Sequence, residues 1–301
     1  MTGSLDASAT VSPPVASLAP GAARLPTAKS GRLWRAAVRD VRLGDVLAFI
    51  WVFALLVFVL LPGLATSHGP LEEVGKSFLP PSHDYWLGTD YLGRDLYSRI
   101  VYGTSRTLAG SLMAVFIGLA AGVVLGLLGA YFGRITDTII GRIVDVLLSI
   151  PGLLLSMVVV VALGFGQFSA AVAVGVASIA TFTRLMRSEV LTVRNLQFVE
   201  AAAHLGAGRF RVLATHVLPN SYGSVLALSA LQFGSAILWI ASLSYLGYGA
   251  PPPEPEWGRL VSEGRKYIVA SPGLLIYPAG AIVFSVLAIS RISQFVRRRV
   301  G

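Results

Sequence analysis

Residues 146–183 read VLLSIPGLLLSMVVVVALGFGQFSAAVAVGVASIATFT, a run of 38 residues without a charged side chain. A single α-helix of that length would extend about 57 Å, whereas the hydrocarbon core of a bilayer is about 30 Å thick. The run must therefore cross a membrane twice. The predicted turn is Gly164-Phe165-Gly166-Gln167, because glycine adopts backbone conformations that a sharp bend requires. Pro151 is expected to kink the first of the two helices.

Four further uncharged stretches are each long enough for one crossing, at 46–64, 108–131, 224–248 and 273–290. Lipid cannot satisfy free backbone groups, so all six spans should be helices. Hydrophobic residues make up 54% of the chain and charged residues only 13%, about half the charge of a soluble domain. The chain has no cysteine, which excludes disulfide frameworks, thiolate metal sites and cysteine nucleophiles. The sequence predicts an all-α polytopic membrane protein with six transmembrane helices.

The lysines and arginines predict the orientation. With the N-terminus in the cytoplasm, 17 of the 24 lie in cytoplasmic segments and 7 in external loops, so both termini are expected to be cytoplasmic. The net charge of +9 then faces anionic membrane lipid, which argues against nucleic-acid binding. Residues 1–44, rich in Ala, Ser and Pro before they turn basic, are expected to form a disordered cytoplasmic tail. Residues 45–106 should hold the first span and an external loop, and 296–301 a short cytoplasmic tail.

One polar segment between two spans falls on the cytoplasmic side, FVEAAAHLGAGRFRVLATHVLPN at 198–220, called the EAA segment below. Apolar residues at helical spacing lie on both sides of Gly206, which should bend the chain. Glu200 lies in the first turn, where a carboxylate complements the helix dipole, and Pro219 is expected to end the second helix. The pattern predicts a short, rigid helix–bend–helix. It leaves open whether this element lies on the lipid surface or docks on a partner.

The spacing of Glu200-Ala201-Ala202, Gly206 and Pro219 resembles the EAA motif of ABC importer permeases. His216, where isoleucine is usual, is similar to the peptide and nickel branch of that family. Two external segments resemble that branch as well, WLGTDYLGRDLYSRIVYGTSRTL (86–108) and SYLGYGAPPPEPEWGRLVSEGRKYI (244–268). The resemblance covers about 40–295, whereas the C-terminal sequence lacks the acidic ending common in the branch.

This resemblance implies a type I ABC importer permease fold, with the permease domain at 107–295, in the bacterial cytoplasmic (inner) membrane. It implies that the EAA segment couples to a cytoplasmic ATPase, with Phe210 or Leu213 filling an apolar pocket there. The implied coupling residues are Glu200, Ala201, Ala202, Gly206, Phe210, Leu213, His216 and Pro219.

The implied partners are a second homologous permease, two ATPase subunits and an extracytoplasmic substrate-binding protein. The implied cargo is di- or oligopeptides, and the alternatives are nickel or another metal chelate, or a secondary transporter without ATPase. The stretch GPLEEVGKS at 69–77 fails the spacing of a phosphate-binding loop. No nucleotide site, catalytic set or metal-ligand spacing is therefore predicted in this chain. The resemblance implies that ATP and magnesium bind to the partner ATPase.

Charged residues of the external loops have two possible uses, structural ion pairs or contact with a partner. Asp90, Arg94, Asp95 and Arg99 suit a short surface helix with internal ion pairs. A contact with the external binding protein is the alternative use, and the candidate contact residues in the external loops are Asp90, Arg94, Asp95, Trp257 and Glu263.

Asp145 is expected to pair with Arg142 at the membrane interface, although an ionisable residue at that depth is also a candidate functional group. Gly118, Gly122 and Gly126 recur every four residues, a spacing that favours close helix packing; contact with a partner helix or lining of a pathway is the alternative.

Overall fold

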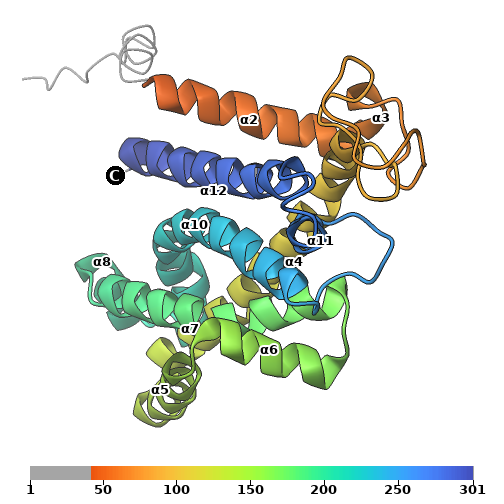
Figure 1. Ribbon diagram of the computed structural model, residues 1–301. Coiled ribbons are helices and arrows are strands. Elements are labelled where there is room, and N and C mark those ends of the chain that lie inside the picture. The colour runs from red at the N-terminus through yellow and green to blue at the C-terminus, as the bar shows by residue number, and fades with distance from the viewer. Residues whose placement is uncertain (1–41, 301) are drawn as a thin grey trace, which may run out of the picture. The chain divides into compact units, whose positions relative to one another are not determined.

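The computed structural model describes residues 42–300, without the side chains of Arg134, Ala203, Arg209 and 296–300. The predicted disordered tail falls outside this part except for its last residues, where Arg42 already caps the first described helix. The described residues contain no β-strand, only two isolated bridges. The helices, coloured along the chain in Figure 1, are α2 (Leu43–Leu60), α3 (Pro62–Ala65), α4 (Leu96–Phe132), α5 (Arg134–Ser149), α6 (Gly152–Leu163), α7 (Gln167–Arg194), α8 (Gln197–His204), α9 (Arg209–Val212), α10 (Leu218–Tyr245), α11 (Trp257–Arg265) and α12 (Gly273–Val300).

Five of these helices are long and apolar enough to span a membrane: α2, α4, α7, α12 and the continuous helical stretch Phe210–Tyr245 that contains α10. The bent pair of α5 and α6 makes a sixth, so the prediction of six helical spans is confirmed when this pair counts as one. The predicted turn is also in place. Gly164 and Gly166 have φ values of 91° and 150°, and α7 starts at Gln167.

The span formed by α5 and α6 is broken into two helices rather than kinked. The residue before a proline avoids the α region, and Ile150 is extended with φ −95° and ψ 128°. The helix therefore ends at Ser149, and a new one begins at Gly152 at an angle of 96° to the first. Pro151 has a larger effect than the expected kink, because α6 packs along α7 and α5 packs against α4 and α7.

The most extensive helix–helix contact is between α4 and α7, which touch along a row of glycines. A Cβ at Gly126 would lie 2.7 Å from the Cβ of Met186, and one at Gly118 would lie 2.8 Å from the Cβ of Ser178. A Cβ at Gly122 would lie 3.0 Å from the carbonyl oxygen of Ile179. The prediction that these glycines pack within the bundle is confirmed, since only hydrogen fits between the two backbones.

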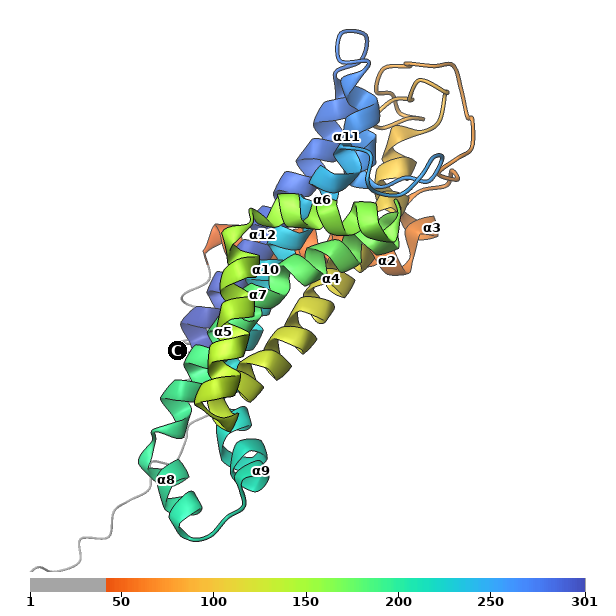
Figure 2. The same ribbon diagram turned by 90° about the horizontal axis from the view of Figure 1, so that it is seen from below.

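The segments with candidate functions lie at opposite ends of the bundle. Figure 2 shows α8 and α9 at one end, with α11 and the loop between α3 and α4 at the other. At its N-terminal end, α2 is fixed to α12, where Arg291 Nε donates to Asp45 Oδ1 at 2.8 Å and Asp45 is 1% exposed. Further along, Trp51 Nε1 donates to Ser285 Oγ at 3.0 Å. These contacts join the first span to the last.

Candidate functional site

The EAA segment forms a helix–bend–helix, as its sequence predicts. Helix α8 ends at His204, Gly206 adopts φ +84°, and α9 starts at Arg209. A Cβ at Gly206 would meet no atom within 4 Å, so the requirement for glycine comes from the left-handed backbone alone. Glu200 is exposed in the first turn of α8, and its carboxylate forms no hydrogen bond with another described residue.

Pro219 does not end the second helix, contrary to the prediction. Leu218 has helical angles, φ −58° and ψ −47°, and Pro219 lies in the first turn of α10. The turn before it, Leu213–Val217, is a π-turn, in which the Leu218 N–H donates to the Leu213 carbonyl five residues earlier. This wider turn accommodates a proline that has no N–H and whose ring would collide with a regular preceding turn. The chain is therefore helical from Arg209 into the span.

The exposed surface of the EAA segment carries large apolar side chains beside charged ones such as Glu200 and Arg211. Leu205 is 88% exposed, Phe210 73% and Phe198 47%, whereas Val212 and Val217 are buried. Of the two residues predicted to fill a partner's pocket, Phe210 is exposed and Leu213 packs partly against the core.

Most of the other predicted coupling residues are accessible: Ala201, Gly206 and Pro219 are exposed, and Ala202 and His216 are half-buried. Leu205 was not among the predicted coupling residues, although it is 88% exposed. Its position next to the bend glycine was the available signal, since a bend lifts its flanking residue away from the bundle.

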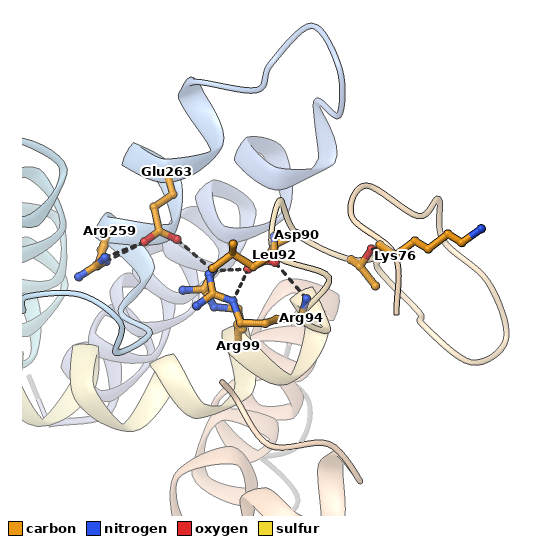
Figure 3. Close-up of polar contacts among 8 residues, drawn as sticks. Lys76, Asp90, Leu92, Arg94, Arg99, Arg259 and Glu263 are labelled. Atoms are coloured by element: carbon orange, nitrogen blue, oxygen red, sulfur yellow. Dashed lines mark hydrogen bonds and ion pairs between the residues drawn. The ribbon is translucent and has the colours of Figure 1, made fainter. Parts of the chain in front are cut away.

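At the opposite end, a network of buried charges joins the loop between α3 and α4 to α4 and α11 (Figure 3). Asp90 is 1% exposed, and its Oδ2 accepts from Arg94 Nε and from Arg99 Nη1, each at 2.7 Å. Its Oδ1 accepts from the backbone N–H groups of Leu92 and Arg94 at 2.8 and 3.0 Å. One carboxylate thus fixes a tight turn and two guanidinium groups.

Arg99 extends this network to α11. Its Nη1 also donates to Glu263 Oε2 at 2.9 Å, and Glu263 Oε1 accepts two bonds from Arg259 at 2.8 Å each. Trp257, fully buried, donates from its indole nitrogen to the Ile100 carbonyl at 3.0 Å. The loop before α4 and the helix before α12 are therefore one packed unit.

This arrangement corrects the prediction of a surface helix at 90–99. Asp90 and Arg94 lie in the turn before α4, Asp95 caps that helix by accepting from the Ser98 N–H at 3.0 Å, and all are at most 4% exposed. Buried hydrogen-bonded charges are costly to separate, so they hold structure here. Of the five candidate contact residues, Asp90, Arg94, Asp95 and Trp257 are buried and support the surface from beneath, whereas Glu263 is partly exposed.

Glu256 is a second buried carboxyl in this unit, which the sequence reasoning did not single out. It is 0% exposed, and neither of its oxygens has a hydrogen-bond partner among the described residues. Burial raises the pKa of Glu256 to about 7, an effect that the nearby Ser244 hydroxyl, the Gly258 amide and two arginines only partly offset.

Two ion pairs join α5 to α7. Arg187 binds Asp137 through two nitrogens, with Nη2 to Oδ2 at 2.7 Å. The expected partner of Asp145 was Arg142, but Asp145 instead faces Arg184 on α7, with 3.9 Å between Oδ1 and Nη2. The bend at Pro151 brings α5 alongside α7, which a straight-helix argument could not anticipate.

The chain matches the family model described as "Binding-protein-dependent transport system inner membrane component" over residues 107–300. It is 42% identical over 217 residues to the glutathione transport system permease protein GsiD of Pectobacterium atrosepticum, covering 72% of each chain. It is 35% identical over 268 residues to the dipeptide transport system permease protein DppC of Alkalihalophilus pseudofirmus, covering 88% of each. A probable D,D-dipeptide transport system permease protein, DdpC of Escherichia coli, is 36% identical over 250 residues, covering 83% of this chain and 84% of that protein.

Solved structures agree on the fold. An inward-facing structure of the MetNI methionine ABC transporter aligns with a TM-score of 0.55 and 20% identity, covering 67% of this chain and 96% of that chain. An amino acid ABC transporter solved with histidines aligns with a TM-score of 0.53 and 17% identity, covering 67% and 94%. At these identities the likeness concerns the arrangement of the helices.

Proposed function

Because the chain belongs to the inner-membrane components of binding-protein-dependent transport systems, the permease subunits of ABC importers, we propose that it imports di- or oligopeptides. Relatives at 35–42% identity carry names for glutathione, dipeptide and D,D-dipeptide transport, which supports a peptide over the nickel or metal-chelate alternative. Membership of this family also argues against a secondary transporter without an ATPase.

The observation that carries the proposal is the EAA segment at one end of the bundle. Its exposed Leu205 and Phe210 form an apolar surface on a short helix–bend–helix, and the π-turn joins it to α10 without a flexible linker. An exposed apolar patch on a rigid element is typical of a protein interface. The proposed occupant is a cytoplasmic ATPase subunit, which supplies the ATP and magnesium chemistry.

The proposed mechanism uses this rigidity. ATP binding closes the ATPase pair, and the EAA segment moves with the groove in which it is seated. The motion passes through α9 and the π-turn into α10, and through α8 into α7. These two spans flank the segment, so their displacement opens the path to the external side, where a binding protein releases its peptide. Hydrolysis and product release reset the helices.

The complete transporter is proposed to contain a second homologous permease, two ATPase subunits and an external binding protein. The binding protein would dock on the surface that the buried Asp90–Arg99–Glu263 network holds in shape. Both termini are proposed to be cytoplasmic, on the distribution of lysine and arginine. Alkaline phosphatase fused after Val300 tests this orientation, since an active fusion would place the C-terminus outside.

Copurification of the ATPase subunits with the full complex tests the coupling assignment. Leu205→Glu places a charge in the proposed apolar interface and should release the ATPase from the permease. Val269→Glu is the matched control, because Val269 is 96% exposed but lies beyond α11, at the other end of the bundle. Retention of the ATPase by Leu205→Glu would contradict the proposal.

Gly206→Leu adds a test of geometry. Leucine at φ +84° is strained by about 1–2 kcal/mol, so the bend should open and peptide uptake should fall while membrane insertion stays intact. Normal uptake by Gly206→Leu would show that the bend does not transmit the ATPase motion.

A further inference from the structure

A cavity of about 1340 Å³ opens between α7 and α10, close to the EAA segment. One face of α7 lines it through Thr181, Arg184, Leu185 and Ser188, spaced as neighbours on a helix. The opposite wall is the start of α10. The lining residues there include Gly223, Ser224 and Ala227, whose small size leaves the space unfilled. Leu148, Ile292 and Ser293 extend the wall from α5 and α12.

Among the residues that the structure describes, Arg184 is the only charged one that lines the cavity. The other two arginines of α7 are engaged by the protein: Arg187 binds Asp137 through two nitrogens, and Arg194 Nη1 donates to the Ala130 carbonyl at 2.7 Å. Arg184 forms no hydrogen bond with a described residue. Its planar guanidinium therefore has donors available for a ligand, in a geometry that matches a carboxylate.

Asp145 is the nearest anion to Arg184, and the pair is loose. Nη2 and Oδ1 lie 3.9 Å apart, too far for a hydrogen bond, and the two side chains are 69% and 62% exposed. An exposed pair of this kind is weakly held. A ligand carboxylate that reaches hydrogen-bond distance would displace it, so Asp145 acts as a competitor for the cation.

The rest of the lining suits a peptide. Thr181, Ser188, Asn220 and Ser224 offer hydroxyl and amide groups from two helices, and leucine side chains cover much of the remaining wall. A pocket that is mostly apolar with a few convergent polar groups is typical of small-molecule sites. Scattered hydroxyls recognise a peptide backbone without selecting side chains, while a single cation selects a charged end.

We propose that this cavity binds the C-terminal carboxylate of the transported peptide, with Arg184 as the residue that holds it. The inference rests on the proposed peptide import and adds a binding site on the permease itself. It distinguishes peptides with a free carboxylate from those with a blocked one, independently of the external binding protein.

Equilibrium binding to the whole permease–ATPase complex, in phosphatidylcholine nanodiscs and without binding protein, tests the site. The probes are tritiated dialanine, trialanine and glutathione, together with trialanine amide. We expect trialanine to bind the wild type about 10-fold or more tightly than its amide, because the amide loses a charge-assisted hydrogen bond. Arg184→Gln should weaken trialanine binding by the same factor and should bind acid and amide equally.

Two further variants test charged residues other than Arg184. Asp145→Asn removes the competitor and should tighten trialanine binding about 2- to 5-fold. Arg142→Gln removes a cation three residues from Asp145 that does not line the cavity, and should bind like the wild type. Unchanged thermal unfolding of Arg184→Gln confirms that the fold is intact, as its lack of hydrogen bonds predicts.

Three outcomes overturn the inference: equal affinity of wild type and Arg184→Gln for trialanine, absence of binding of every probe to the wild type, or loss of peptide binding when phosphatidylglycerol replaces phosphatidylcholine. The last result would identify a lipid site. Uptake of the same peptides by the wild-type complex with its binding protein is measured in parallel. Uptake without Arg184-dependent binding refutes the site alone, whereas absence of uptake refutes peptide import.

Discussion

Replacing Asp90 by asparagine should detach the loop between α3 and α4 from the bundle. The substitution keeps the size of the side chain but removes its charge. It leaves the guanidinium of Arg94 without an anion, while Arg99 retains Glu263. It also places an NH₂ group where one carboxylate oxygen now accepts two hydrogen bonds, so donors must face donors.

The magnitude follows from burial. Asp90 is 1% exposed and accepts four hydrogen bonds, two of them from guanidinium groups at 2.7 Å. Removing one partner of a buried ion pair costs about 3–5 kcal/mol. The low end of that range is sufficient here, since Glu263 continues to neutralise Arg99. A loss of about 3 kcal/mol corresponds to about 100-fold more frequent local opening.

Hydrogen exchange in the assembled complex measures this opening directly. The N–H of Leu96 donates to the Gly88 carbonyl at 3.1 Å, and that of Asp90 donates to the Arg94 carbonyl at 2.9 Å, so both report on the turn. Glu73→Gln is the control, because Glu73 is an exposed carboxylate of the same loop. Exchange that accelerates less than 10-fold in Asp90→Asn, or equally in both variants, would refute the reasoning.

Two further predictions concern α4 and Glu256. Gly122→Val should destabilise the fold by about 1–3 kcal/mol in thermal unfolding, because its Cβ would lie 3.0 Å from the Ile179 carbonyl, whereas Gly141→Val, with no atom within 4 Å, should not; equal melting of the two variants would contradict this. The pKa of Glu256 is raised from 4.5 to about 7, so the stability that its protonated form contributes is present below pH 4.5 and lost as the pH rises through 7. We expect exchange of the Leu260 amide, which donates to the Glu256 carbonyl, to reveal a loss of up to about 3 kcal/mol over this interval that Glu256→Gln removes. The same pH dependence in both proteins would exclude Glu256 as its source.

The spans could be predicted because each depends on a local property, a stretch without charge that is long enough to cross a bilayer. The need for a turn followed from length, since 38 uncharged residues cannot form one crossing, and the glycines at 164 and 166 gave its position. The break at Pro151 was only half predictable. Proline disfavours the helix locally, but the 96° angle depends on how α5 and α6 pack on other helices.

The Asp90–Arg99–Glu263 network could not be predicted from the sequence for a physical reason. Asp90 and Arg99 are close in sequence and suggested a local surface helix, but Glu263 lies 164 residues after Arg99. Spacing within one segment carries no information on a partner so distant. Burial, which turns these charges from surface groups into internal ones, is a property of that distant contact.

The EAA segment also has one feature that could be predicted from the sequence and one that could not. Its bend was predictable because only Gly206 tolerates φ +84° without strain. Its exposed face was not, since apolar residues occur on both sides of α8 and only packing decides that Val199 is buried while Leu205 is exposed.

The π-turn at Leu213–Val217 sets the direction in which the EAA segment points. Successive residues of an α-helix are rotated by about 100° around its axis. The extra residue in this turn therefore rotates α9 and the bend relative to α10 by an amount that no side-chain substitution can reproduce. Deleting one residue there would leave every helix intact and every contact surface in the chain, yet turn the EAA surface away from the ATPase proposed to bind it. The position of Phe210 around the axis of α10 is thus encoded by the number of residues in one turn.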